Sequence, residues 1–191
     1  MLNTHIVKRY ICLLSLIFFT LGVKATDEPE AWQAWRNGEA IVLMRHALAP
    51  GTGDPAGFQL EDCATQRNLN AQGRTQAKAW GRTLQHHAAG PVTIYSSQWC
   101  RCLETAQLFG LGNVQPLAAL NSFFAGRGNG QQQTAALIRR FSNAKVAQPT
   151  VLVSHQVNIT ALTGIFPASA EAIILALPLS QPATILAVIS P

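Results

Sequence analysis

The chain has 191 residues, with 14 Lys and Arg against 9 Asp and Glu, giving a formal net charge of +5. Hydrophobic residues make up 48% of the sequence and charged residues 12%, a composition that is typical of a globular protein and excludes a disordered one. The length allows one domain with a sizeable core and is short for two.

The first 25 residues have the features of a cleaved secretory signal. Lys8 and Arg9 precede an apolar run over residues 10–23, and compact residues follow at the usual recognition positions of a signal peptidase. An uncleaved membrane anchor is the alternative, but about 14 apolar residues fall short of the roughly 20 that span a bilayer. We therefore expect a signal peptide over residues 1–25, one domain over residues 26–191, no membrane span after cleavage, and a periplasmic protein.

Removal of this signal changes the charge of the chain. Lys8, Arg9 and Lys24 leave with it, so 11 basic residues remain against 9 acidic ones, a net charge of about +2. Proteins that bind nucleic acid carry clustered Lys and Arg, and the predicted mature chain contains no such block. We therefore expect no nucleic-acid partner.

The predicted elements alternate between strands and helices. A polar lead over residues 26–38 carries Trp32 and Trp35, which we expect to pack back on the body. Continuous apolar runs are typical of strands buried on both faces, and apolar residues at steps of three and four predict helices. In chain order these are a strand at 40–44, a helix at 71–87, a strand at 92–95, helices at 102–109 and 131–143, and strands at 150–153, 172–177 and 183–189.

This order predicts the fold class. Alternating strands and helices form a mostly parallel sheet, so we expect an α/β three-layer sandwich with helices on both faces. The last two strands are separated by Pro178 and Pro182, and we expect them to form a hairpin that supplies one antiparallel edge strand.

Three cysteines remain in the predicted mature chain: Cys63, Cys100 and Cys102. Because export permits disulfides, we expect one bridge, from Cys63 to either Cys100 or Cys102. Cys100 and Cys102 are too close in sequence for a relaxed bridge between themselves. The alternative is that all three are small buried hydrophobic residues. No histidine lies near them at ligand spacing, so we expect no metal site.

Polar side chains follow the three central predicted strands. Arg45 and His46 end the first, Ser97 and then Arg101 follow the second, and His155 follows the third. The carboxyl ends of parallel strands lie at one edge of the sheet, so these side chains should meet. Arginine forks match a phosphoryl group, and a deprotonated imidazole nitrogen can attack phosphorus to form a phosphohistidine.

Four segments resemble the signatures of the histidine phosphatase superfamily, in the family's order. Residues 43–47 (Leu-Met-Arg-His-Ala) resemble its Arg-His-Gly signature, and residues 96–106 resemble the Ser-Ser-x-x-x-Arg block. Residues 151–155 resemble the block with the second histidine, and residues 67–77 the Arg-x-Leu-Thr-x-x-Gly-x-x-Gln-Ala stretch of short members. The chain is thus similar to short exported bacterial members of the superfamily.

The resemblance implies roles for individual residues. His46 accepts the phosphoryl group, Arg45 and Arg101 bind it, and His155 supports the transition state. The further binding residues expected in the same pocket are Arg67, Ser97 and Gln156. No cofactor is implied. The expected activity is a metal-independent phosphatase acting on a phosphorylated small molecule or glycan, with an envelope sugar phosphate as one candidate substrate.

The sequence departs from the family at two points. Ala47 replaces the usual glycine, which a small side chain tolerates at an ordinary backbone angle. Neither family position for a general acid is acidic, because one segment reads Leu-Ala-Ala-Leu-Asn over residues 117–121 and the other position is Gln156. Of the carboxylates in the loop after His46, we expect Asp62 or Glu61 to donate the proton.

Two alternatives remain open. A phosphoramidate, such as a phosphohistidine, has a good leaving group and needs no general acid. A non-catalytic protein that binds phosphate or a phospho-glycan would keep the pocket without the acid.

Overall fold

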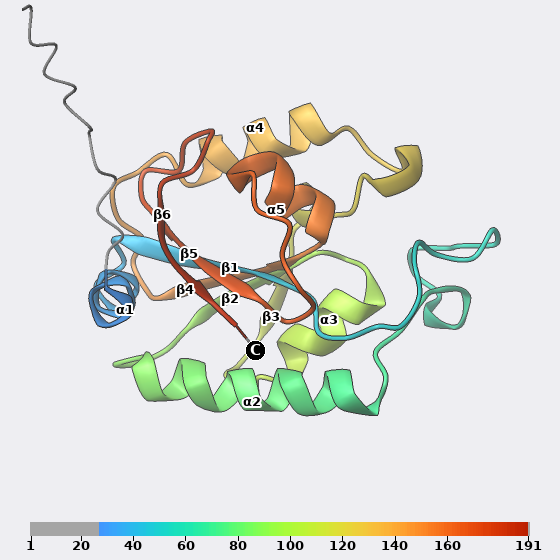
Figure 1. Ribbon diagram of the computed structural model, residues 1–191, viewed down its shortest axis with the longest axis horizontal. Helices are drawn as coiled ribbons and strands as arrows, with labels where there is room; N and C mark the ends of the chain where they lie inside the picture. Colours follow the sequence, from blue (N-terminus) through green and yellow to red (C-terminus); the bar gives the residue numbers. More distant parts are fainter. Residues whose placement is uncertain (1–26, 191) are drawn as a thin grey trace, which may run out of the picture.

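The computed structural model describes residues 27–190 (Figure 1). The predicted signal peptide lies outside these residues. Within this range, six strands and five α-helices follow one another in alternation up to the last two strands, which follow each other directly. The strands are β1 (Ala40–Arg45), β2 (Thr93–Ser96), β3 (Val114–Pro116), β4 (Thr150–Ser154), β5 (Ala172–Ala176) and β6 (Ile185–Ile189), and the helices are α1 (Glu28–Arg36), α2 (Ala71–His87), α3 (Cys100–Gln107), α4 (Gly130–Arg140) and α5 (Gln156–Thr163).

The strands form one sheet in the order β3-β2-β4-β1-β5-β6. The pairs β1–β4, β2–β4 and β2–β3 are parallel, whereas β5 runs antiparallel to both β1 and β6. The predicted α/β fold with a mostly parallel sheet is therefore confirmed. The antiparallel strand is β5, which forms the expected edge hairpin with β6.

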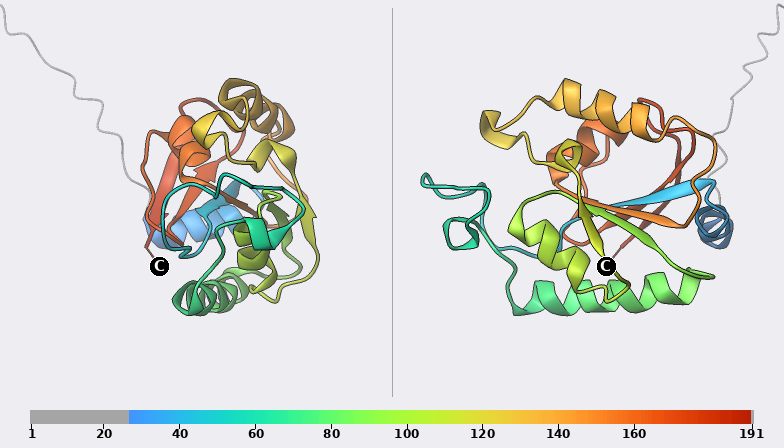
Figure 2. Two further views of the ribbon diagram at one scale, coloured as in Figure 1. Left: turned by 90° about the vertical axis from the view of Figure 1, so that its right-hand side faces the viewer. Right: turned by 180° about the vertical axis from the view of Figure 1, so that it is seen from behind.

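Alternate residues of the central strands enter two different cores. Val42 and Met44 of β1 belong to the core under α1, α2 and α3, while Ile41 and Leu43 belong to the core under α4 and α5. Side chains of successive strand residues point to opposite faces, so a strand that is apolar throughout needs cover on both sides. Figures 1 and 2 show this arrangement, with α2 and α3 on one side of the sheet and α4 and α5 on the other.

Helix α2 packs closely against the segment that follows β1. A Cβ added at Gly73 would overlap the carbonyl oxygen of Leu48, so only glycine allows this approach. Asn70 caps the helix by accepting a hydrogen bond from the Gly73 amide, and its own amide donates to the Leu48 carbonyl at 3.2 Å. The start of α2 is thus fixed to Leu48, which lies two positions after His46 in the sequence.

Four elements differ from the sequence expectations. The polar lead forms helix α1, whose Trp35 indole donates to the Thr150 carbonyl at 2.9 Å and so anchors the helix to β4. The short edge strand β3 and helix α5 were not predicted. Helix α3 begins two residues earlier than expected, at Cys100. Within residues 27–190, none of the helices has the length and apolarity needed to cross a membrane.

Candidate active site

The polar strand ends meet at one edge of the sheet. The register of β1 and β4 pairs Arg45 with Ser154, so the next residues, His46 and His155, lie side by side. Their ring centroids are 5.5 Å apart. Arg101 reaches the same place from the first turn of α3, which follows β2. The parallel register therefore brings together residues that are separated by more than 50 positions.

These side chains surround a cavity of about 170 Å³. Its interior carries the two imidazoles and three guanidinium groups, and its mouth carries aromatic and polar side chains. The lining residues are Arg45, His46, Gly51, Thr52, Gly53, Asp54, Arg67, Arg101, Ser122, Phe124, Arg127, His155, Gln156, Val157 and Phe166.

The hydrogen bonds of His46 define the state of its ring. Nδ1 lies 2.8 Å from the carbonyl oxygen of Ala47, which can only accept, so Nδ1 carries the proton. Nε2 is then unprotonated, and it accepts a hydrogen bond from Arg101 Nε at 3.2 Å. Burial lowers the pKa of His46 well below its usual value, and the charge of Arg101 lowers it further. The ring is therefore neutral near pH 7, and the lone pair of Nε2 accepts only the hydrogen bond from Arg101.

His155 is also held in a neutral state. Its Nδ1 accepts a hydrogen bond from Arg101 Nη2 at 3.3 Å, because a guanidinium only donates. Its Nε2 therefore donates to the hydroxyl of Ser97 at 2.8 Å, and that hydroxyl donates to Asn121 Oδ1 at 3.2 Å. Burial, followed by the charge of Arg101, lowers the pKa of His155 well below its usual value. Ser97 thus binds the ring nitrogen of His155 that does not contact Arg101, and so orients the ring.

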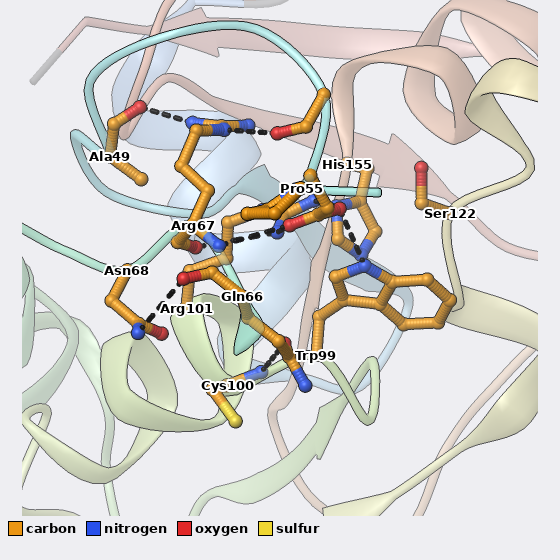
Figure 3. Close-up of polar contacts among 12 residues, drawn as sticks. Ala49, Pro55, Gln66, Arg67, Asn68, Trp99, Cys100, Arg101, Ser122 and His155 are labelled. Atoms are coloured by element: carbon orange, nitrogen blue, oxygen red, sulfur yellow. Dashed lines mark hydrogen bonds and ion pairs between the residues drawn. The ribbon is translucent and has the colours of Figure 1, made fainter. Parts of the chain in front are cut away.

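The arginines make the cavity cationic. Arg45 Nη1 donates to the Pro167 carbonyl at 2.9 Å, while its buried Nε has no hydrogen-bond partner among residues 27–190. Arg67 donates to the carbonyls of Ala49 and Gly53 (Figure 3), and burial together with the charge of Arg101 lowers its pKa to about 10. A buried donor without a partner costs free energy, so this arrangement favours an incoming anion.

Comparison with known proteins identifies the family. Residues 41–144 match the sequence profile of the histidine phosphatase superfamily (branch 1). The chain belongs to this superfamily. The match spans the Arg45-His46 block, the Arg67 stretch and the Arg101 block, so the resemblance inferred from the sequence is confirmed at the level of the superfamily. A search of curated proteins found no significant match.

Solved structures share the superfamily fold. The protein histidine phosphatase SixA, complexed with tungstate, aligns with a TM-score of 0.58 at 16% identity, covering 80% of this chain and 97% of SixA. The phosphoserine phosphatase of Entamoeba histolytica, in complex with 3-phosphoglyceric acid, aligns at 0.53 and 15%, covering 80% and 97%. The product of the Mycobacterium tuberculosis open reading frame Rv3214 aligns at 0.53 and 17%, covering 77% and 95%.

The carboxylate in this superfamily member's cavity is not one that we expected. Glu61 and Asp62 are exposed and do not line the cavity, and Asp62 instead caps a short helical turn by accepting from the Ala64 amide. Asp54 lies in the cavity, with Oδ1 2.7 Å from Arg101 Nη1. The expectation that Glu61 or Asp62 donates the proton therefore has no geometric support. Sequence order alone did not distinguish Asp54 from the other two loop carboxylates.

A disulfide joins the loop after His46 to helix α3. It links Cys63 to Cys100, which resolves the two pairings left open by the sequence. Cys100 directly precedes Arg101, and its amide donates to Gln66 Oε1 at 3.0 Å (Figure 3). Cys102 is a free, buried thiol whose pKa is raised by burial to about 12. Within residues 27–190, no cluster of three His, Cys, Asp or Glu side chains is placed to hold a metal ion.

Proposed function

We propose that this protein is a metal-independent phosphatase that hydrolyses a phosphomonoester through a phosphohistidine on His46. The observation that carries the proposal is the unprotonated Nε2 of His46, which faces a cavity that also holds the guanidinium groups of Arg45, Arg67 and Arg101. A neutral imidazole nitrogen is a nucleophile, and arginine forks stabilise the charge on the phosphoryl oxygens.

The reaction has two steps. In the first, Nε2 of His46 forms a bond to phosphorus, and the bond from phosphorus to the leaving oxygen breaks. The leaving oxygen takes a proton from solvent or from an acidic group of the substrate. In the second, water attacks phosphorus, the P–N bond breaks, and the water proton leaves to solvent while phosphate is released. Arg45, Arg67 and Arg101 hold the phosphoryl oxygens in both steps.

His155 acts as a donor once phosphate has bound. In the free protein its Nδ1 accepts from Arg101, so it carries no proton toward the cavity. A phosphate dianion beside the ring favours the protonated form, in which Nδ1 donates to a phosphoryl oxygen while Nε2 keeps its bond to Ser97. The structural neighbour SixA was solved in complex with tungstate, an oxyanion, and this supports an oxyanion as the kind of ligand.

The mouth of the cavity accommodates an organic leaving group. Phe124 is 45% exposed and Phe166 is 73% exposed, and both line the cavity together with Arg127 and Gln156. Exposed aromatic side chains beside a polar pocket are typical of a ligand site. We propose that the enzyme is periplasmic and that its substrate is a sugar phosphate of the cell envelope.

A second candidate is a phosphoramidate phosphatase. It is favoured by one observation: the carboxylate of Asp54 is tied to Arg101 by two hydrogen bonds and is therefore a poor proton donor. When the P–N bond of a phosphoramidate breaks, its nitrogen group has already been protonated by solvent and leaves as a neutral amine or imidazole. Such a substrate therefore needs no acid from the protein. The structural neighbour SixA is a protein histidine phosphatase, and phosphohistidine is a phosphoramidate.

The mature protein can be tested on an aryl phosphate, whose phenolate leaves without an acid. We expect turnover that is insensitive to a metal chelator and is lost in His46→Ala. The control is His86→Ala, an exposed histidine at the end of α2. Quenching in alkaline detergent during turnover should trap base-stable, acid-labile phosphate on the wild-type chain and none on His46→Ala.

Two outcomes decide between the alternatives. Tight phosphate binding without turnover on the activated ester would identify a non-catalytic binder and refute the enzyme. Rapid hydrolysis of phosphoramidate together with no measurable hydrolysis of alkyl phosphates would favour the second candidate over the first.

A further inference from the structure

Arg101 has an acceptor for each of its five N–H donors. On one edge of the guanidinium, Nε donates to His46 Nε2 at 3.2 Å and Nη2 donates to His155 Nδ1 at 3.3 Å. At the opposite end, Nη1 and Nη2 donate to the two carboxylate oxygens of Asp54 at 2.7 and 3.3 Å. The remaining Nη1 proton points to the Arg67 carbonyl at 3.4 Å. The planar fork is therefore fixed in one orientation.

The carboxylate of Asp54 is itself fixed from three sides. Its Oδ1 accepts from the Arg67 amide at 3.1 Å, and its Oδ2 accepts from the Trp99 indole at 3.1 Å. Figure 3 shows Trp99, Arg67 and Arg101 gathered around this point beside His155. The side chains of Arg101 and Asp54 are only 3% and 4% exposed. The pair is therefore held in place by the protein and shielded from solvent.

The two ends of the guanidinium face different partners. A phosphoryl group on His46 Nε2 lies against the edge formed by Nε and Nη2, because these are the donors that face the imidazoles. Asp54 occupies the other end, formed by Nη1 and Nη2, and so does not compete with phosphate for the first edge, whose donors bind the two imidazoles in the free protein.

We propose that Asp54 is a positioning residue whose carboxylate holds the Arg101 fork so that its Nε–Nη2 edge faces both imidazoles. The role of that edge toward phosphate rests on the function proposed above. The orientation of the fork itself is a property of the free protein and does not depend on any reaction.

A proton-donor role for Asp54 makes a different prediction. Burial alone would raise the pKa of Asp54, but the hydrogen bond and charge of Arg101, with the Arg67 amide and the Trp99 indole, lower it below its usual value. The carboxylate is thus ionised near pH 7 and has no proton to give. Loss of a proton donor would harm only substrates with poor leaving groups, whereas loss of a positioning residue harms all substrates equally.

The test compares Asp54→Asn with the wild type on phenyl phosphate and on p-nitrophenyl phosphate, whose leaving groups differ in basicity. We expect kcat to fall by about 10- to 100-fold on both esters, since small misplacements of a catalytic group have effects of this size. Inorganic phosphate should bind as tightly as before or more tightly, because a negative charge has left the cavity. Asp54→Glu keeps the charge and should lose less than Asp54→Asn.

The matched control is Asp62→Asn, which removes a carboxylate of the same loop that lies outside the cavity and should leave kcat unchanged. A fall in kcat confined to phenyl phosphate would identify Asp54 as a proton donor and overturn the proposal. Unchanged kcat on both esters would overturn it as well. A folded Asp54→Asn protein that no longer binds phosphate would mark a general loss of the pocket, again against the proposal.

A readout without turnover separates this proposal from the proposed function. Nitrogen-15 NMR of the histidine rings reports the hydrogen bond that His46 Nε2 accepts from Arg101. We expect its Nε2 signal in the phosphate-free protein to move toward that of a free lone pair in Asp54→Asn and to stay in place in Asp62→Asn. An unmoved signal refutes the positioning role, even if the wild type proves to be an active phosphatase, and a moved signal supports it even if no ester is hydrolysed.

Discussion

Acidification is expected to destabilise the fold because two imidazoles are buried in their neutral form. Burial and the nearby Arg101 charge lower the pKa of both His46 and His155 well below the usual value of 6.5. Below about pH 6.5 the unfolded chain takes up two protons at these positions, whereas the folded chain does not. The free energy of unfolding therefore rises with pH across this window and falls as the solution is made acidic.

The size of the effect follows from proton linkage. Each proton taken up only by the unfolded chain lowers the free energy of unfolding by about 1.4 kcal/mol per pH unit. Two histidines give a slope that approaches about 2.7 kcal/mol per unit below pH 6.5, or about 3 kcal/mol between pH 6.5 and pH 5. That is a large part of the roughly 5–15 kcal/mol that stabilises a typical domain. The pKa of His87 is also lowered, by burial against Trp32, and adds in the same direction.

Urea denaturation at a series of pH values measures this slope. His155→Asn should remove about half of it, whatever the variant does to stability at pH 7, because one of the two protons is no longer taken up. His86→Asn, at the exposed end of α2, is the matched control and should keep most of the wild-type slope, because it removes only a charge that acts on His87. A free energy of unfolding that stays flat between pH 7 and pH 5, or an unchanged slope in His155→Asn, would refute the neutral burial of these rings.

Three further predictions concern the segments around the site. Gly73→Ala should lower the free energy of unfolding by about 1–3 kcal/mol in urea, because its Cβ overlaps the Leu48 carbonyl, whereas Gly90→Ala, which meets no atom within 4 Å, should not. Reduction of the Cys63–Cys100 disulfide, which spans 37 positions, should lower it by about 3–4 kcal/mol, and a Cys63→Ser, Cys100→Ser protein should no longer respond to reductant. Phe166→Ala should raise KM for an aryl phosphate by about 2- to 10-fold without weakening inhibition by phosphate, while Val188→Ala, which removes another exposed apolar side chain, should change neither.

The elements that the sequence predicted are those with a strong periodic or continuous apolar pattern. Strand β1 is apolar over five consecutive residues and buried throughout, so its pattern and its environment agree. Helix α5 was missed because it contains the β-branched residues Val157, Ile159 and Thr160, which have low helix propensity. Burial of Ile159 and Leu162 against the sheet stabilises the helix there, and no local pattern reports that contact.

The same distinction applies to the site. The meeting of His46, Arg101 and His155 could be predicted because each follows a strand of a parallel sheet, whose register fixes where the strand ends lie. The position of Asp54 could not be predicted, because the loop that carries it has no periodic hydrophobic pattern and Asp54 lies 47 positions from Arg101 in the sequence.

A disulfide and a backbone hydrogen bond hold the loop, and they bear on how the site works. The Cys63–Cys100 disulfide fixes the loop to the start of α3, and the Arg67 amide fixes Asp54 within it. The sheet therefore places the nucleophile and the guanidinium, while the loop sets the direction in which that guanidinium points. Because the strand ends are fixed by the core, changes in this loop can alter the orientation of Arg101 and the shape of the mouth without moving the backbone that carries His46 and His155.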